Sequence, residues 1–325
     1  MRHLPPVIGC LLLLSGGPVA AEVFALAKGQ DIIGEPGMML SRHEDTLPDI
    51  ARLHHLGFDE IVAANPGVDV WLPGEGTHVT LPMQRLIPDV PRTGLVVNLS
   101  EGRLYYFRND AKGHPVVETY PVSVGQVGRT MPLGTTKVIA KQKKPTWYPP
   151  KSIRDRHIAE GDVLPPFVPP GPDNPLGEYA LRLAIPSGAY LIHGTNKPVS
   201  VGLQITNGCI RLYPEDIEAL FKEVPVGTPV RIVNQRIKVG WGEDGALYLE
   251  VRHPLDGTDP KDVEDLTELT RMIVAATAQR RVIVDWDAAE QVFAQERGEP
   301  VRISVDRWVE PPVASAPVPR GRRHP

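Results

Sequence analysis

The chain has 325 residues, of which 42% are hydrophobic and 23% are charged, and its formal net charge is −4. This is the composition of a soluble globular protein with room for two or three compact units. It argues against a nucleic-acid binder, which carries a basic surface. No apolar run approaches the roughly 18–20 residues of a membrane-spanning helix, so no membrane span is expected.

Residues 1–21 are typical of an export signal. Arg2 provides the positive start, an apolar run covers Val7–Leu14, and small residues precede Glu22. The residues before Cys10 resemble a lipoprotein cleavage box. However, the leucine run follows this cysteine instead of preceding it, so lipidation is not expected. We predict an exported protein, periplasmic where the host has an outer membrane.

Residues 22–90 are predicted to form a first unit with two short helices between strands. Thr46 is a plausible N-cap for one helix, and Asp59 for a second that stops at residues 65–67. A short strand is expected at His78–Pro82. The order of elements, with the runs Asp-Thr-Leu at 45–47 and Ala-Asn-Pro at 64–66, resembles the LysM module. That resemblance implies binding of glycan strands rich in N-acetylglucosamine; a small helical spacer is the alternative.

Residues 94–234 show the period-two pattern of a β-rich unit. A hairpin is expected from Leu95–Leu99 and Leu104–Phe107, and a helix at Pro214–Lys222, where proline and acidic residues occupy the first turn. The proline-rich stretch Pro145–Pro150 is expected to be a loop. Further strands are expected at Val116–Val124, Gly134–Ala140, Tyr179–Leu183, Ala189–Ile192 and Pro229–Asn234. We therefore predict a mainly β protein with a β-sandwich-like catalytic unit and small α+β additions.

Residues 235–308 read as a small α+β extension. Strands are expected at Ile237–Trp241 and Leu247–His253, and a helix near Asp262–Ala278. Asp285 and Asp287 flank a tryptophan and are read as a solvated turn, in preference to a metal site. Residues 309–325 are predicted to be a disordered, proline-rich tail.

Cys209 is the only cysteine left once the export signal is discounted. Exported proteins usually pair their cysteines as disulfides, and Cys209 has no partner in its own chain. A lone thiol is then either a buried small hydrophobic group or a nucleophile. Its neighbourhood, with His193 sixteen positions earlier, favours the nucleophile, because an imidazole can accept the thiol proton and generate a thiolate.

The residues around this pair carry a resemblance to a known family. The runs Ile192-His193-Gly194 and Thr206-Asn207-Gly208-Cys209-Ile210-Arg211, with Trp147-Tyr148-Pro149-Pro150 between strands, resemble the L,D-transpeptidase catalytic domain, also called the YkuD type. The family pattern has histidine directly before Gly-Cys, and this chain has Asn207. The resemblance assigns the base to His193, so the nucleophile–base pair is retained.

Other residues near the pair are assigned supporting roles. Gly208 is expected to let the backbone turn sharply, and its N–H and that of Cys209 are natural oxyanion donors. Arg211 is expected to hold a substrate carboxylate; a structural ion pair is the alternative. The remaining candidates for substrate contact are Tyr190, Gly194, Thr195, Thr206 and Asn207.

The resemblance implies an enzyme of peptidoglycan. Cys209 would attack the carbonyl of the third stem residue, a diamino acid, and expel terminal D-alanine. An amine of another stem or of an outer-membrane lipoprotein lysine would then accept the acyl group, and water would make the enzyme a carboxypeptidase. No metal or organic cofactor is implied. Two alternatives are a non-catalytic wall-binding protein and an exported thiol hydrolase of unrelated peptides.

Overall fold

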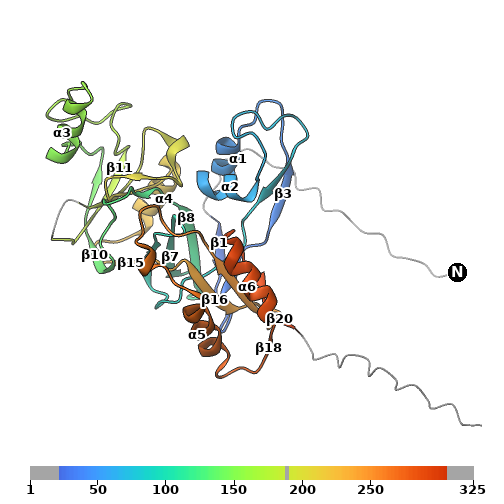
Figure 1. Cartoon of the computed structure of the whole chain (residues 1–325). Coiled ribbons are helices and arrows are strands. Elements are labelled where there is room, and N and C mark those ends of the chain that lie inside the picture. Colours follow the sequence, from blue (N-terminus) through green and yellow to red (C-terminus); the bar gives the residue numbers. More distant parts are fainter. Residues whose placement is uncertain (1–21, 187–189, 306–325) are drawn as a thin grey trace, which may run out of the picture.

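The centre of the molecule is one curled sheet, which is nine-stranded in the part that the computed structural model describes, residues 22–186 and 190–305 (Figure 1). The predicted export signal and tail lie outside the described residues. From one edge to the other the strands are β1 (Val23–Ala25), β8 (Pro115–Pro121), β7 (Arg103–Asn109), β6 (Gly94–Asn98), β15 (Pro229–Val233), β10 (Gly134–Lys143), β11 (Tyr179–Leu183), β12 (Leu191–His193) and β14 (Ile210–Arg211). The predicted hairpin is confirmed, with Leu95 opposite Tyr106.

The predicted mainly β character is confirmed, and the predicted β-sandwich-like unit is one continuous curled sheet. Strand β15 pairs in parallel with β6 and antiparallel with β10, and hydrogen bonding therefore runs unbroken from one half to the other. The two halves curl around a shared core, in which Leu104 of β7 and Leu181 of β11 belong to one buried cluster. Helix α4 (Pro214–Glu223) closes this core with Ile217 and Leu220, and its predicted proline start is confirmed.

Two features of the catalytic unit differ from the predictions. The strand expected over Val116–Val124 is divided into β8 and β9 (Val124–Gly125), because Ser123 leaves β8 and bridges Arg211. Strand β9 pairs in parallel with β13 (Gln204–Thr206). A helix α3 (Lys151–Ala159), which the sequence analysis missed, begins directly after the proline-rich loop, with Pro150 as its N-cap.

The N-terminal unit has the element order β3 (Gly37–Leu40), α1 (Leu47–Leu53), α2 (Phe58–Ala64) and β4 (His78–Leu81). The Thr46 cap is confirmed, since its Oγ1 accepts from the N–H of Asp49 at 3.2 Å. The second cap is Gly57 and not Asp59, because the Glu60 carboxylate accepts from the Gly57 N–H at 3.1 Å.

The two ends of the predicted 22–90 unit form strands that lie outside its helical part. Strand β1 extends the central sheet, with Phe24 opposite Val117. Strands β2 (Ile32–Ile33) and β5 (Arg85–Leu86) pair with each other. They lie against the C-terminal extension, where the Leu86 N–H donates to Glu250. The part of the predicted unit that contains its two helices is therefore the segment from β3 to β4.

This segment docks on the catalytic unit. Arg52 makes a bidentate ion pair with Glu215 at 2.7 and 2.8 Å, and the Tyr213 hydroxyl donates to the Leu56 carbonyl at 3.0 Å. A Cβ on Gly202 would lie 2.3 Å from the backbone nitrogen of Phe58, so the two backbones touch.

The C-terminal extension is α+β, as predicted. A sheet of β16 (Ile237–Trp241), β17 (Leu247–Val251) and β19 (Val301–Arg302) packs against α5 (Leu266–Thr277) and α6 (Trp286–Gln295), and β18 (Ile283–Val284) pairs with β20 (Ser304–Val305). Helix α5 starts later than predicted, at an Asp265 cap. The predicted solvated turn at Asp285 is wrong, because its carboxylate caps α6 by accepting from the Ala288 N–H at 3.0 Å. Among the described residues, no helix has both the length and the apolar character to cross a bilayer.

Candidate active site

Two neighbouring strands place the thiol and the imidazole on one face of the sheet. Strands β12 and β14 run parallel, with Ile192 opposite Ile210 and His193 opposite Arg211. Cys209 directly precedes β14, so it lies diagonal to His193 and points to the same face as Arg211.

Both side chains line a pocket of about 540 Å³. Four other residues predicted to bind substrate also line it: Tyr190, Thr206, Asn207 and Arg211. Gly194, Thr195 and Gly208 are not among its lining. The Thr195 hydroxyl accepts from the Lys197 N–H at 2.9 Å, and the Gly194 N–H donates to the Tyr179 carbonyl at 3.2 Å. These two residues shape the backbone around His193 instead of facing the pocket.

The surroundings of Cys209 keep its thiol neutral at pH 7. Burial raises the thiol pKa above its usual value, while a backbone hydrogen bond from Leu191 and the Arg211 charge act in the opposite direction. The side chain is nevertheless partly exposed to the pocket. A substrate carbonyl can therefore reach the sulfur.

His193 is a neutral base in this setting. Burial and the nearby Arg211 charge lower its pKa to about 4. Its Nδ1 lies 2.6 Å from the Gly194 carbonyl, which can only accept, so Nδ1 carries the proton. In the neutral ring the free lone pair is then on Nε2, the nitrogen that can accept a proton.

Alkylation of Cys209 should show this neutral resting pair directly. Because the thiol pKa is raised, we expect its iodoacetamide rate to keep rising above pH 9, with no inflection between pH 6 and 7. The rate is measured from the mass of the proteolytic peptide that contains Cys209, with glutathione as the control thiol. A rate already constant at pH 7 would indicate a resting thiolate–imidazolium pair and contradict the expectation.

The turn before the nucleophile is fixed by Thr206. Its hydroxyl donates to the Cys209 carbonyl at 2.7 Å and accepts from the Gly208 N–H at 3.2 Å. Gly208 has φ +100°, a conformation that favours glycine, and a Cβ there would lie 3.1 Å from both the Arg129 carbonyl and the Tyr190 ring. The sharp turn is as expected, but the Gly208 N–H points to Thr206 in this conformation. Its predicted role as an oxyanion donor requires that bond to open.

Asn207 and Arg211 have different partners. The Asn207 side-chain oxygen accepts from the Arg129 guanidinium, a contact that the sequence analysis did not find. Arg211 donates to the Ser200 hydroxyl at 2.9 Å, while its Nε is buried without a hydrogen-bond partner. Within the described residues Arg211 makes no salt bridge, so the alternative of a structural ion pair is not supported there.

The segment 144–177, which includes α3, forms one wall of the pocket through residues such as Trp147 and Ile153. Trp147 and Val168 exchange backbone hydrogen bonds at 2.9 and 2.8 Å. Asn174 is fully buried, and its NH₂ lies 2.8, 3.2 and 3.1 Å from the carbonyls of Pro145, Val168 and Pro169.

The same asparagine reaches the base through the backbone. Its side-chain oxygen accepts from the Leu176 N–H at 2.9 Å, and a hydrogen bond from the His193 ring to the Leu176 backbone raises the pKa of His193. The sequence alone gave no role to Asn174. A buried amide that joins distant carbonyls is visible only once the loop is folded.

Replacing Asn174 by alanine is expected to lower the free energy of unfolding by about 2–4 kcal/mol, because the buried Pro145 carbonyl and Leu176 N–H both lose their partner. Chemical denaturation measures this, with Asn109→Ala as the control because that side chain is exposed. Equal stability of the two variants would contradict the role of Asn174.

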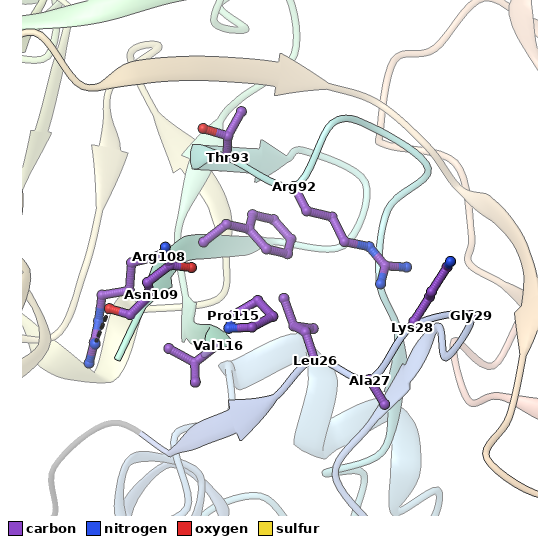
Figure 2. Close-up of a pocket in the computed structure, with 11 residues that line it drawn as sticks. Leu26, Ala27, Lys28, Gly29, Arg92, Thr93, Arg108, Asn109, Pro115 and Val116 are labelled. Atoms are coloured by element: carbon purple, nitrogen blue, oxygen red, sulfur yellow. Dashed lines mark hydrogen bonds between the residues drawn. The ribbon is translucent and has the colours of Figure 1, made fainter. Parts of the chain in front are cut away.

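A second hollow, of about 480 Å³, lies between the chain after β1 and the ends of β7 and β8 (Figure 2). It is lined by Arg92, Lys28 and Arg108, among others, but by no thiol or imidazole. Arg92 is already held by Asp31 and by the Gln30 carbonyl. This hollow therefore offers no thiol–imidazole pair, and the pocket at Cys209 is the better candidate for the active site.

Comparison with known proteins shows the family to which the chain is similar. Residues 92–232 match the family model of the L,D-transpeptidase catalytic domain, YkuD. "Probable L,D-transpeptidase YcfS" of Escherichia coli (strain K12) is 38% identical over 290 residues, 88% of this chain and 89% of that protein. "Probable L,D-transpeptidase ErfK/SrfK" of the same strain is 36% identical over 313 residues, 94% of this chain and 98% of that protein. The solved L,D-transpeptidase 3 from Mycobacterium tuberculosis is 19% identical, with a TM-score of 0.31 over 48% of this chain and 66% of that one. The similarity to the two E. coli proteins extends well beyond the matched domain.

Proposed function

The chain belongs to the L,D-transpeptidases with a YkuD catalytic domain, and we propose that it transfers peptidoglycan stem peptides through a thioester on Cys209. One observation carries the proposal: a thiol and a neutral imidazole lie on adjacent parallel strands and line the same pocket. The low pKa of His193 leaves its Nε2 able to accept a proton at neutral pH.

The first half of the reaction forms the thioester. His193 Nε2 takes the thiol proton as Cys209 Sγ attacks the carbonyl of the third stem residue, a diamino acid. The C–N bond to the terminal D-alanine breaks, and His193 returns the proton to the leaving amine. The backbone N–H of Cys209, joined by that of Gly208 once it leaves Thr206, stabilises the oxyanion. Arg211 binds a carboxylate of the stem.

The second half consumes the thioester. An incoming amine gives its proton to His193 and attacks the carbonyl carbon, which releases the thiolate. The amine belongs to a second stem, which gives a cross-link between third residues, or to the lysine of an outer-membrane lipoprotein. Water as acceptor would give carboxypeptidase activity. No metal or organic cofactor takes part in these steps.

The parts outside the catalytic unit support the same setting. The segment from β3 to β4 acts as a LysM-like module that holds glycan strands close to the pocket and raises the local substrate concentration. Residues 1–21 export the chain, so the protein works in the periplasm. The proline-rich tail over 309–325 has no assigned role.

The test is the intact mass of the protein lacking residues 1–21 after incubation with a disaccharide-tetrapeptide. We expect a mass gain equal to the donor minus D-alanine, together with free D-alanine, and a carbapenem should block both by acylating Cys209. If no adduct forms between pH 5 and 9 while glycan binding is intact, the alternative of a non-catalytic wall-binding protein is favoured. Cleavage of ordinary L-peptides would favour the exported thiol hydrolase.

A further inference from the structure

The nucleophile is flanked by two arginines, only one of which the proposed mechanism uses. In the sheet, Leu181, Ile192 and Ile210 form one row across β11, β12 and β14, and all three side chains are buried in the core. Since side chains alternate along a strand, the rows on either side face the pocket. One of these rows holds His193 and Arg211.

The other row runs from Cys209 through Leu191 to Arg182. Arg182 is paired with Leu191 on β11, and all three residues line the pocket. Two strand spacings separate Arg182 from Cys209, or roughly 10 Å between their Cα atoms. Arg211, by contrast, is two residues further along the strand of Cys209. The two guanidiniums therefore approach the sulfur from different sides.

The charge of this pocket differs from that of the whole chain. The chain has a net charge of −4, yet none of the described residues that line the pocket is acidic, and Arg182 and Arg211 are its cationic members. Neither arginine is in a salt bridge with any residue that the structure describes. Arg182 is exposed at the mouth of the pocket, where a ligand could reach it. Two guanidinium groups with no opposing acid fit a ligand with two carboxylates.

We propose that Arg182 forms a second carboxylate subsite, so that the enzyme selects donor stems carrying a free carboxylate on each side of the reacting carbonyl. Arg211 holds one carboxylate of the donor, and Arg182 holds a second. The two carboxylates lie one or two residues apart along the donor peptide, at ~3.5 Å of chain per residue. The second carboxylate is either the one on the side chain of the third residue or the one on the second residue. This inference rests on the proposed function, because it describes the donor of that reaction.

The test replaces one donor carboxylate at a time by a carboxamide and measures kcat/KM for acyl-enzyme formation. The proteins compared are the wild type, Arg182→Gln and Arg154→Gln. Arg154 is an exposed cation on α3 outside the pocket lining, so its variant controls for loss of one positive charge. For the unmodified donor, we expect kcat/KM to fall about tenfold or more in Arg182→Gln and less than about twofold in Arg154→Gln.

The decisive result is the coupling between variant and donor. One amidated donor should lower kcat/KM about tenfold for the wild type and not at all for Arg182→Gln. The position of that amide then identifies the carboxylate that Arg182 binds. Arg182→Lys should recover part of the loss, since it keeps the charge but not the two-pronged geometry. If every amidated donor lowers kcat/KM by the same factor in Arg182→Gln and in the wild type, Arg182 binds no donor carboxylate. The inference is then wrong, while the enzyme remains a transpeptidase. If no protein forms an acyl-enzyme with any donor, the proposed function itself fails, and this inference with it.

Discussion

Cys209→Ala is expected to abolish acyl-enzyme formation and to lower kcat/KM by about 10⁴-fold or more, in line with the loss of a nucleophile in other acyl-transfer enzymes. No other described residue in the pocket carries a thiol, and the neighbouring hydroxyl of Thr206 is committed to the Cys209 carbonyl. The measurement is release of D-alanine together with the intact mass of the protein.

The same variant should fold normally. The Cys209 side chain is small and partly exposed, so its truncation should change the free energy of unfolding by less than about 1 kcal/mol. Circular dichroism and the midpoint of chemical denaturation check this. D-alanine release by folded Cys209→Ala at the wild-type rate would show that the reaction uses another group.

His193→Asn is expected to slow acyl-enzyme formation by about 10²–10⁴-fold, the usual contribution of a general base. Asparagine is chosen because its amide NH₂ can replace Nδ1 as the donor to the Gly194 carbonyl, which lies 2.6 Å from Nδ1. It has no nitrogen that can take a proton. The backbone around residue 193 should therefore stay in place while the base is lost.

A pH series separates a lost base from a disturbed site. Above the thiol pKa, Cys209 ionises without help, so iodoacetamide should alkylate the variant and the wild type equally fast at high pH. In the wild type, the His193 pKa of about 4 predicts that the base form persists and that activity declines only as the pH falls toward 4. A much lower alkylation plateau at high pH in His193→Asn would point to a blocked thiol instead, and would contradict the role of base.

The local elements were the most predictable part of the fold. The hairpin of β6 and β7 and the helix α4 follow from patterns within ten to fifteen residues: alternating apolar side chains around a glycine turn, and proline with acids in a first turn. The second cap was predicted at Asp59 and lies at Gly57, because the deciding hydrogen bond runs from the Gly57 N–H to the Glu60 carboxylate. Helix α3 was missed because a proline-rich stretch reads as loop although proline also starts helices.

The site was predictable only in part. The spacing of His193 and Cys209 indicated the pair, but not that parallel strands β12 and β14 would join them. Arg182, Arg129 and Asn174 gave no signal, because their partners lie 9, 78 and up to 29 positions away in the chain. Their contacts depend on how the sheet curls and how the segment 144–177 folds over it.

The sequence by itself determined the candidate nucleophile and base and the type of most local elements. A single thiol beside a glycine, an imidazole sixteen residues earlier and period-two strands are properties of short stretches, which backbone geometry and residue type control directly. The tertiary structure alone decided the register of the strands, the charge and depth of the pocket, and the ionisation of the pair. Those properties depend on burial and on distances between segments far apart in the chain: burial lowers the pKa of His193 and raises that of Cys209, and only the folded sheet brings Arg211 close to both.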